Sequence, residues 1–147
     1  MLPGKGKTWL DKLNDKSKEA QVKRLEKDFA DMPAHSMMLI ATPKIIDHYV
    51  RAIPKGKSVS LSTMRKDLAV EYHADYTCPV TTGIFLRIVA EAAYQQYQEG
   101  GTLSKISPFW RVVDEKSALL KKLSFGSEFV LNQRKKEGLG TGSAKKD

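Results

Sequence analysis

The first forty residues carry few apolar positions, and their pattern predicts one helix followed by a short apolar segment. Three apolar residues recur at helical spacing within residues 17–30 and predict a helix there: Val22, Leu25 and Phe29. Residues 37–40, with the sequence MMLI, form a run too short for its period to separate a strand from an extended packing segment. We expect the helix to dock lightly on the main body of the chain.

Two helix starts follow, each marked by a capping residue. Thr42 can serve as an N-cap, and Pro43 suits the first helical position because its missing N–H has no partner to lose there. This helix is expected to stop at Pro54. Ser60 predicts the cap of the next helix, whose inward-facing residues are expected to be Leu61, Met64 and Leu68.

A longer helix is expected to begin at Pro79 and to end before Gly100. Apolar residues at every fourth position predict its buried face: Val80, Ile84, Ile88 and Ala92. A second face places Arg87 on a surface kept shallow by small neighbours, and it consists of Gly83, Arg87, Ala90 and Tyr94. Together with the preceding helix, this arrangement predicts a helix-turn-helix.

The last third of the chain predicts a break followed by two short helices. Residues 106–113 are expected to form a strand or loop around Pro108, and Asp114 is expected to cap a helix through Leu123. A final helix is expected to begin near Ser127, with Phe129 and Val130 facing inward. It ends in the three cations of residues 134–136, which suit the negative end of a helix.

Charge and cysteine content narrow the partners and the compartment. The 147 residues fit one domain, and their net charge of +8 attracts phosphate backbones, so nucleic acid is the leading partner. The same lysines also suit a role in solubility alone. The single cysteine, Cys78, and the lack of a long apolar run predict a cytoplasmic protein that is neither exported nor inserted in a membrane. No cofactor, metal ion or small-molecule substrate is expected.

Three stretches resemble a known DNA-binding domain. The run TPKIIDHYVRAIPKGKSVSLSTMRKDLA, the helix around Arg87 and the later SPFWRVV resemble, in this order, the methylated-DNA-protein cysteine alkyltransferases and their inactive alkyltransferase-like relatives. The resemblance covers roughly residues 42–123. It implies a mainly α, winged helix-turn-helix fold that enters the minor groove, here with an added N-terminal helix and short β segments. We therefore expect an N-terminal helical extension over 1–41, the winged-helix domain over 42–138 and a flexible basic tail over 139–147.

The resemblance assigns DNA contacts residue by residue. Arg87, in LRIVAEA, falls where the family has an arginine that fills the space of a flipped-out nucleotide, and Leu61 replaces a tyrosine that rotates the DNA phosphate. The complete expected DNA-binding set is Arg87, Gly83, Ala90, Leu61, Arg65, Lys66, Lys55 and Lys57. Taken without the family, Arg87 also fits an ordinary exposed arginine or one paired with Glu91.

The same resemblance argues against alkyl transfer. Pro108, Arg111 and Val112 match the first, fourth and fifth positions of the family's PCHRV loop. Phe109 stands where the reactive cysteine would be and Trp110 where its histidine would be. Alkyl transfer needs a thiolate activated by a base, which neither residue supplies, so repair by this loop is excluded. The family's triad glutamate has no secure position in KSALLKKL.

Two interpretations of the aromatic pair stay open. Phe109 and Trp110, with Arg111, either line a pocket that stacks on an extruded base or plug a pocket that has lost its chemistry. An enzyme that uses Cys78, placed before a helix N-terminus with His73 five residues earlier, is a weaker alternative, because a lone cysteine there is more often structural.

The pattern as a whole predicts a non-catalytic protein that binds double-stranded DNA and senses alkylated or flipped bases. The alternative is a protein- or RNA-interaction domain on the same fold, favoured by the loss of the family's tyrosine, cysteine and histidine. Neither alternative explains residues 94–106, which are longer than the compact family spacing.

Overall fold

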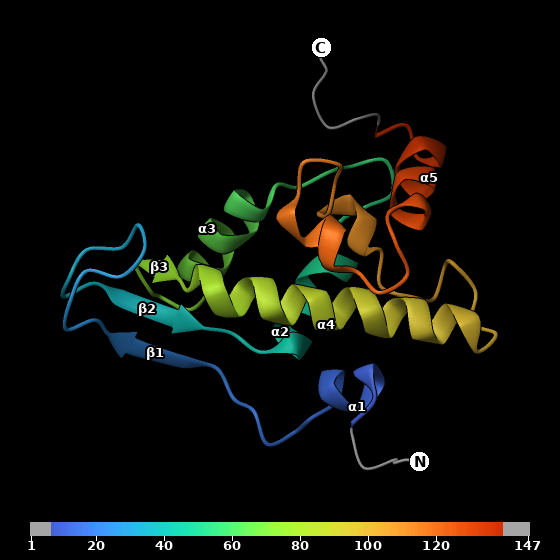
Figure 1. The fold of residues 1–147 in the computed structure, drawn as a ribbon. Coiled ribbons are helices and arrows are strands. Elements are labelled where there is room, and N and C mark those ends of the chain that lie inside the picture. The colour runs from blue at the N-terminus through green and yellow to red at the C-terminus, as the bar shows by residue number, and fades with distance from the viewer. Residues whose placement is uncertain (1–6, 140–147) are drawn as a thin grey trace.

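The computed structural model describes residues 7–139 and is mainly helical, with one small sheet. Its longest element, α4 (Pro79–Gln98), runs through the centre of the molecule (Figure 1). The other helices are α1 (Trp9–Leu13), α2 (Pro43–Arg51), α3 (Leu61–Glu71) and α5 (Glu128–Lys136). The strands are β1 (Gln21–Arg24), β2 (Met37–Ile40) and β3 (Tyr76–Thr77). The expected α-rich fold with short β segments is confirmed at this level.

Local capping signals fix the helix starts as the sequence predicts. The Thr42 side chain accepts a hydrogen bond from the backbone N–H of Ile45 and caps α2, with Pro43 at the first helical position. Ser60 accepts from the backbone N–H of Thr63 and caps α3. Pro79 opens α4. These boundaries were predictable because the capping bonds join residues three positions apart.

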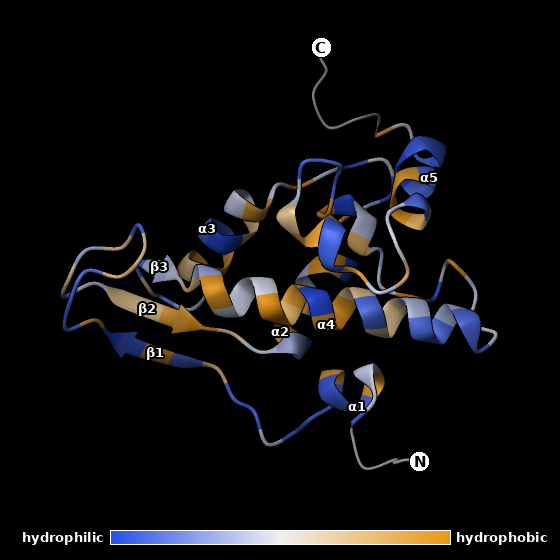
Figure 2. Ribbon diagram, in the orientation of Figure 1, coloured by the Kyte–Doolittle hydropathy of each residue, from blue (hydrophilic) through white to orange (hydrophobic). Residues whose placement is uncertain are grey.

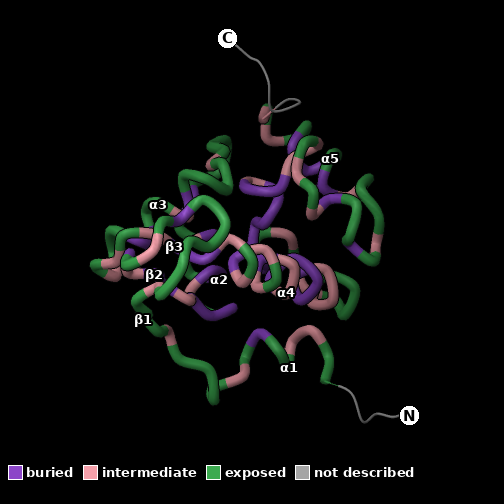
Figure 3. Tube along the Cα trace, turned by 60° about the vertical axis from the view of Figure 1, so that its left-hand side comes forward, coloured by how far each residue is buried: buried purple, intermediate pink, exposed green. Residues whose placement is uncertain are grey.

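The prediction of a helix over residues 17–30 is wrong. Residues 21–24 form β1, which pairs antiparallel with β2 so that Gln21 faces Ile40 and Arg24 faces Met37. Strand β2 in turn pairs parallel with β3. β1 is exposed along its whole length (Figure 3). Three apolar residues gave too narrow a stripe to stabilise a helix, so pairing with an apolar strand determines the conformation instead.

The N-terminal segment is also tied to the rest of the chain. Between residues 7 and 41 the one helix is α1, which Thr8 and Asp11 cap reciprocally and which packs beside α4 (Figure 1). β2 belongs to the same sheet as β3, far along the sequence. Residues 7–41 therefore form a short helix and two strands that pack on the body, rather than the expected helical extension. Of the predicted tail, all but Leu139 lies outside the described residues.

The buried face of α4 differs from the predicted one. Val80 and Ile84 are 54% and 53% exposed. Of the predicted face only Ala92 is buried, and it packs in one core with Leu86, Val89, Ala90 and Ala93 and with residues of α2 and α3. Small alanines let neighbouring helices approach closely, so this side gives the denser packing. The N-terminal half of α4 consequently keeps hydrophobic residues at the surface, while the end towards Gln98 is hydrophilic (Figure 2).

Residues 106–113 take the loop form of the two that the sequence left open, and the α-helix expected after Asp114 is absent. Residues 109–111 and 118–122 are 3-10 turns, and no strand occurs between residues 106 and 123. Asp114 does not cap an α-helix as predicted. Its carboxylate accepts hydrogen bonds from the backbone N–H of Lys116 and from the Ser117 hydroxyl, which closes a local turn.

Candidate functional site

Arg87 is held between an aromatic ring and a buried carboxylate. Its Nε lies 3.5 Å from Oε2 of Glu91, one turn further along α4, without the geometry of a hydrogen bond. Its guanidinium carbon lies 5.3 Å from the centre of the Trp9 ring of α1, close enough for a cation–π contact. The Glu91 side chain is 2% exposed, and both of its oxygens also accept bonds from Ser124. The pairing with Glu91 is the ordinary role that the sequence left open for Arg87.

A groove of about 870 Å³ lies along the N-terminal half of α4. Helix α1 contributes Trp9 and Lys12 to its lining, the start of α3 contributes Leu61, and residues 112–122 line it as well. Much of the lining is apolar and includes the exposed residues Val80 and Ile84 of α4. Three of the predicted DNA-binding residues meet here: Leu61, Gly83 and Arg87.

The rim of this groove is basic. Its lining includes four cations, Lys12, Arg87, Lys116 and Lys122. Asp114 is the one acidic residue in the lining that the structure describes, and its carboxylate already accepts bonds from its own turn. The groove therefore combines an apolar floor with an excess of positive charge, which suits a ligand that carries both an apolar or aromatic group and negative charge.

Other predicted DNA-binding residues lie elsewhere. Arg65 is only partly exposed, because it donates to the backbone carbonyl of Thr77 and pairs with Asp31 at 3.4 Å. Lys66 is exposed on α3, and Lys55 and Lys57 are exposed in the turn between α2 and α3. Ala90 is fully buried in the core, so its predicted contact with DNA is wrong. Arg65 acts in this structure as a link between α3 and β3.

Phe109 and Trp110 are almost fully buried, at 0% and 2% exposed, which corrects the prediction of an accessible base-stacking surface. The Phe109 ring packs against those of Trp110, Phe125 and Phe129, with centroids 5.5, 5.9 and 6.1 Å away. Both side chains belong to the main core. Of the two interpretations that the sequence allowed, this geometry matches the one in which the aromatic pair fills the core.

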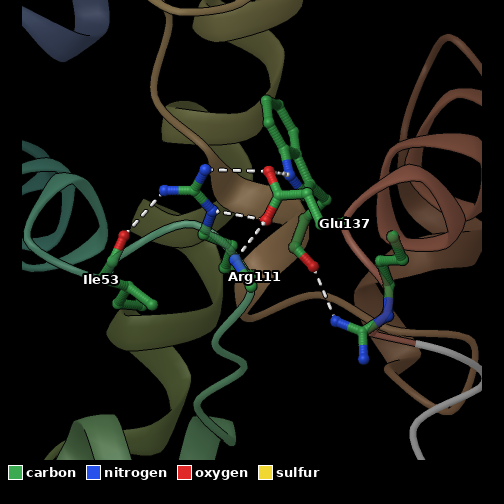
Figure 4. Close-up of polar contacts among 6 residues, drawn as sticks. Ile53, Arg111 and Glu137 are labelled. Carbon is green, nitrogen blue, oxygen red and sulfur yellow. Dashed lines mark hydrogen bonds and ion pairs between the residues drawn. The ribbon is translucent and has the colours of Figure 1, made fainter.

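Trp110 and Arg111 share one carboxylate, that of Glu137 at the end of α5. The Trp110 Nε1–H donates to Oε2 of Glu137 at 2.8 Å, and Arg111 donates to both oxygens, at 2.9 and 2.8 Å. Arg111 also donates to the backbone carbonyl of Ile53 at 2.7 Å, so it lies between Ile53 and Glu137 (Figure 4). Arg111 is therefore a structural link rather than a free pocket residue.

Glu137 is held in its charged form by these donors. Burial raises the pKa of the Glu137 carboxyl, but hydrogen bonds from Arg111, Trp110 and the backbone of Gly56, with the Arg111 charge, outweigh this effect. Its pKa therefore lies below the ordinary value of 4.5. Nearby, the buried Arg134 donates to the backbone carbonyl of Trp110 at 2.7 Å. The cluster is a charged brace between α5 and the SPFWRVV segment.

Sequence reasoning missed Trp9, Lys12, Lys116, Lys122 and Glu137. Trp9 and Lys12 precede the stretch that resembles the alkyltransferases, and Lys116 and Lys122 lie in its poorly matched part. Only the folded chain brings these four residues to one groove. Glu137 is separated from Trp110 by 27 positions. The one available signal was a glutamate in a basic helix end, where a cation is preferred.

Cys78 and His73 offer no support for a thiol enzyme. Cys78 is buried at the start of α4, and its carbonyl accepts a bond from the Thr82 hydroxyl. His73 is exposed in the turn after α3, with a positive φ of 57°. Within residues 7–139 no three His, Cys, Asp or Glu side chains are grouped so that they could hold a metal ion. None of the described helices combines the length and hydropathy that crossing a membrane would need.

Comparisons of this chain with protein-family models, with curated proteins and with solved structures gave no match.

Proposed function

We propose that the protein binds duplex DNA across the groove along α4, with Arg87 entering the duplex and an extruded base resting on the apolar floor. One observation carries the proposal: three residues expected to touch DNA, Leu61, Gly83 and Arg87, line a single groove with a basic rim. Cations on the rim suit the phosphate backbone, which dominates the affinity of proteins for DNA. The apolar lining suits a base, whose faces stack on apolar and aromatic side chains.

The contact between Trp110 and Glu137 supports the family relationship behind this proposal. In the resemblance, Trp110 stands in the place of a histidine that belongs to a triad with a glutamate. Glu137 accepts a hydrogen bond from Trp110 at 2.8 Å, so it is a candidate for the glutamate that the sequence left unassigned. On this interpretation the chain keeps the frame of the family's site while Phe109 and Trp110 replace its reactive groups.

The winged part of the expected motif has weaker support than its helices. Helices α3 and α4 are joined by residues 72–78, which include β3, and no strand follows α4 within residues 7–139. The proposal therefore rests on α3, α4 and the segment 112–122. Arg87 also has to leave Glu91 and Trp9 in order to enter DNA, which requires the incoming phosphates and bases to compensate for both contacts.

The test is a titration of fluorescently labelled duplexes, with and without O6-alkylguanine, followed by anisotropy at two salt concentrations. We expect an affinity that falls steeply with salt, a preference for the alkylated duplex and a loss of binding in Arg87→Ala. Arg87→Lys keeps the charge and is expected to retain part of the affinity. Arg24→Ala, which removes an exposed arginine of β1, is the matched control. Equal affinities of Arg87→Ala and Arg24→Ala would exclude insertion of Arg87.

A second candidate function, docking of an acidic protein segment in the same groove, is favoured by Val80 and Ile84. Exposed apolar side chains on a long helix are more typical of a protein contact than of a phosphate contact. If the parent protein bound neither duplex at low salt, DNA binding would be rejected and this second candidate would remain.

A further inference from the structure

The turn between α2 and α3 is fastened to the end of α5 by hydrogen bonds. The backbone N–H of Gly56 donates to Oε1 of Glu137 at 3.2 Å, and Arg111 joins Glu137 to the carbonyl of Ile53 (Figure 4). Arg134 of α5 donates to the Ser58 hydroxyl at 3.2 Å. Gly56 adopts a φ of +84°, which favours glycine, so the turn has a defined shape. Residues 53–58 therefore hold a fixed position against α5.

Two pairs of lysines are next in sequence to the residues that make this contact. Lys55 and Lys57 flank Gly56 in the turn, and Lys135 and Lys136 directly precede Glu137 in α5. We call these four residues the joint basic patch. All four are exposed, and none forms an ion pair with another of residues 7–139. The patch is thus assembled from two elements that lie almost eighty positions apart.

The carboxylate at the centre of this contact does not neutralise the lysines. Glu137 is used by Arg111, Trp110 and Gly56, and Arg134 adds a further buried positive charge. Arg111 and Arg134 carry two positive charges and Glu137 carries one negative charge. The contact therefore has a net charge of about +1 without the four lysines. The helix dipole favours Lys135 and Lys136 at the end of α5, but it does not account for Lys55 and Lys57. Like charges held together in this way attract an anion.

The patch lies within reach of a duplex that occupies the groove. Lys57 lies four positions before Leu61 of the groove lining, so their Cα atoms are at most about 14 Å apart. Successive phosphates along one DNA strand are spaced by a rise of about 3.4 Å. In a duplex centred on Arg87 and Leu61, phosphates roughly four nucleotides away lie at about the largest distance that can separate Lys57 from Leu61.

We propose that the joint basic patch binds the DNA backbone beside the base held in the groove, which makes Lys135 and Lys136 part of the DNA interface. This inference rests on the proposed function and extends it to α5, which lies outside the stretch that resembles the alkyltransferases. The patch would add phosphate contacts without contributing base specificity. Its loss is expected to weaken binding to alkylated and unmodified duplexes by the same factor.

The experiment compares the salt dependence of binding in three proteins by anisotropy: the parent, Lys135→Ala/Lys136→Ala and Lys23→Ala/Lys27→Ala. Each protein is titrated with two labelled duplexes, one with and one without O6-alkylguanine. The last variant removes the same charge from the exposed segment around β1. Two lost phosphate contacts should make the negative slope of log affinity against log salt concentration shallower by about 1.8. The control should keep the parent slope. Thermal melts establish that all three are folded.

The outcomes separate this inference from the proposed function. A parent that binds with a steep salt dependence, together with a Lys135→Ala/Lys136→Ala variant that behaves like the control, would overturn the patch alone. A parent that does not bind duplex DNA would overturn both proposals. A shallower salt dependence of the affinity in Lys135→Ala/Lys136→Ala, with an unchanged preference between the two duplexes, would support the patch as a backbone contact.

Discussion

Nε of Arg87 lies 3.5 Å from Oε2 of Glu91, whose carboxylate is almost fully buried. Removal of the arginine leaves that buried carboxylate without its cationic partner. Because Arg87 is partly exposed, we expect Arg87→Ala to lower the free energy of unfolding by about 1–2 kcal/mol, less than the cost of breaking a fully buried pair. Urea denaturation at neutral pH measures this change.

A double-mutant cycle identifies the cause of that loss. In a Glu91→Gln background no carboxylate remains, so Arg87→Ala should cost markedly less there than in the parent. Arg24→Ala serves as the exposed control, and its effect should stay within about 0.5 kcal/mol. Equal costs of Arg87→Ala in both backgrounds would show that Glu91 does not hold the arginine. The cycle also gives the stability correction that the DNA-binding measurement on Arg87→Ala requires.

Glu137 makes the stability of the fold depend on pH. Its pKa in the folded chain lies below the ordinary value of 4.5, so the folded state favours the charged carboxylate. This contribution is complete above pH 4.5 and is lost as the pH falls through the lower, folded pKa. We therefore expect the melting temperature to fall below pH 4.5, and to fall less steeply in Glu137→Gln.

Thermal melts between pH 3 and pH 7, followed by circular dichroism, test the role of Glu137 across the pH range in which glutamate side chains titrate. At neutral pH Glu137→Gln should already be less stable than the parent, because Arg111 loses a charged acceptor. Glu26→Gln, at an exposed position, should follow the parent at every pH. If Glu137→Gln and the parent lost stability in parallel as the pH fell, other carboxylates would carry the acid sensitivity.

Restoring a cysteine in the SPFWRVV segment should not restore alkyl transfer. Phe109 is fully buried among aromatic rings, and Trp110 beside it cannot act as a base. A thiol at this place would be shielded from DNA, and burial would raise its pKa. We expect Phe109→Cys to accept no methyl group from O6-methylguanine DNA and to lose about 2–4 kcal/mol of stability through the cavity it leaves.

Mass spectrometry of the intact protein after incubation with the methylated duplex measures the transfer. A Cys78→Ser background removes the other thiol, so any added methyl group would be assigned to the introduced one. Phe109→Leu controls for the loss of aromatic packing. Methylation of Phe109→Cys would mean that the segment opens to DNA, which would contradict the closed aromatic core seen here.

The parts of this fold that sequence predicts well are those set by neighbouring residues. Thr42, Ser60 and Pro79 mark helix starts correctly because each acts within a few positions of itself. The strand β1 was missed because its conformation depends on β2, across a turn of the chain. The brace from Trp110 to Glu137 was missed for the same reason, since neither residue signals its distant partner.

The residues of the candidate site, too, were predicted only in part. Arg87, Gly83 and Leu61 were predicted and do lie together in one groove, whereas Ala90 is buried. A period of four along α4 placed Ile84 in the core, although neighbouring helices pack against the side that carries small alanines. Hydrophobicity alone could not separate these two faces, because both are apolar.

The orientation of α4 gives the last prediction, since the sequence and the structure assign different faces of this helix to the core. Val89 is fully buried and Ile84 is 53% exposed. Val89→Ala removes methyl groups from packed surroundings and should cost about 1.5–3 kcal/mol, whereas Ile84→Ala should cost less than about 1 kcal/mol. Urea denaturation of both variants gives the comparison, and Val80→Ala provides a second exposed position on the same side. If Ile84→Ala cost as much as Val89→Ala, α4 would have to be rotated relative to this structure. The apolar floor of the groove would then belong to the core, and DNA or a protein partner would have to bind elsewhere.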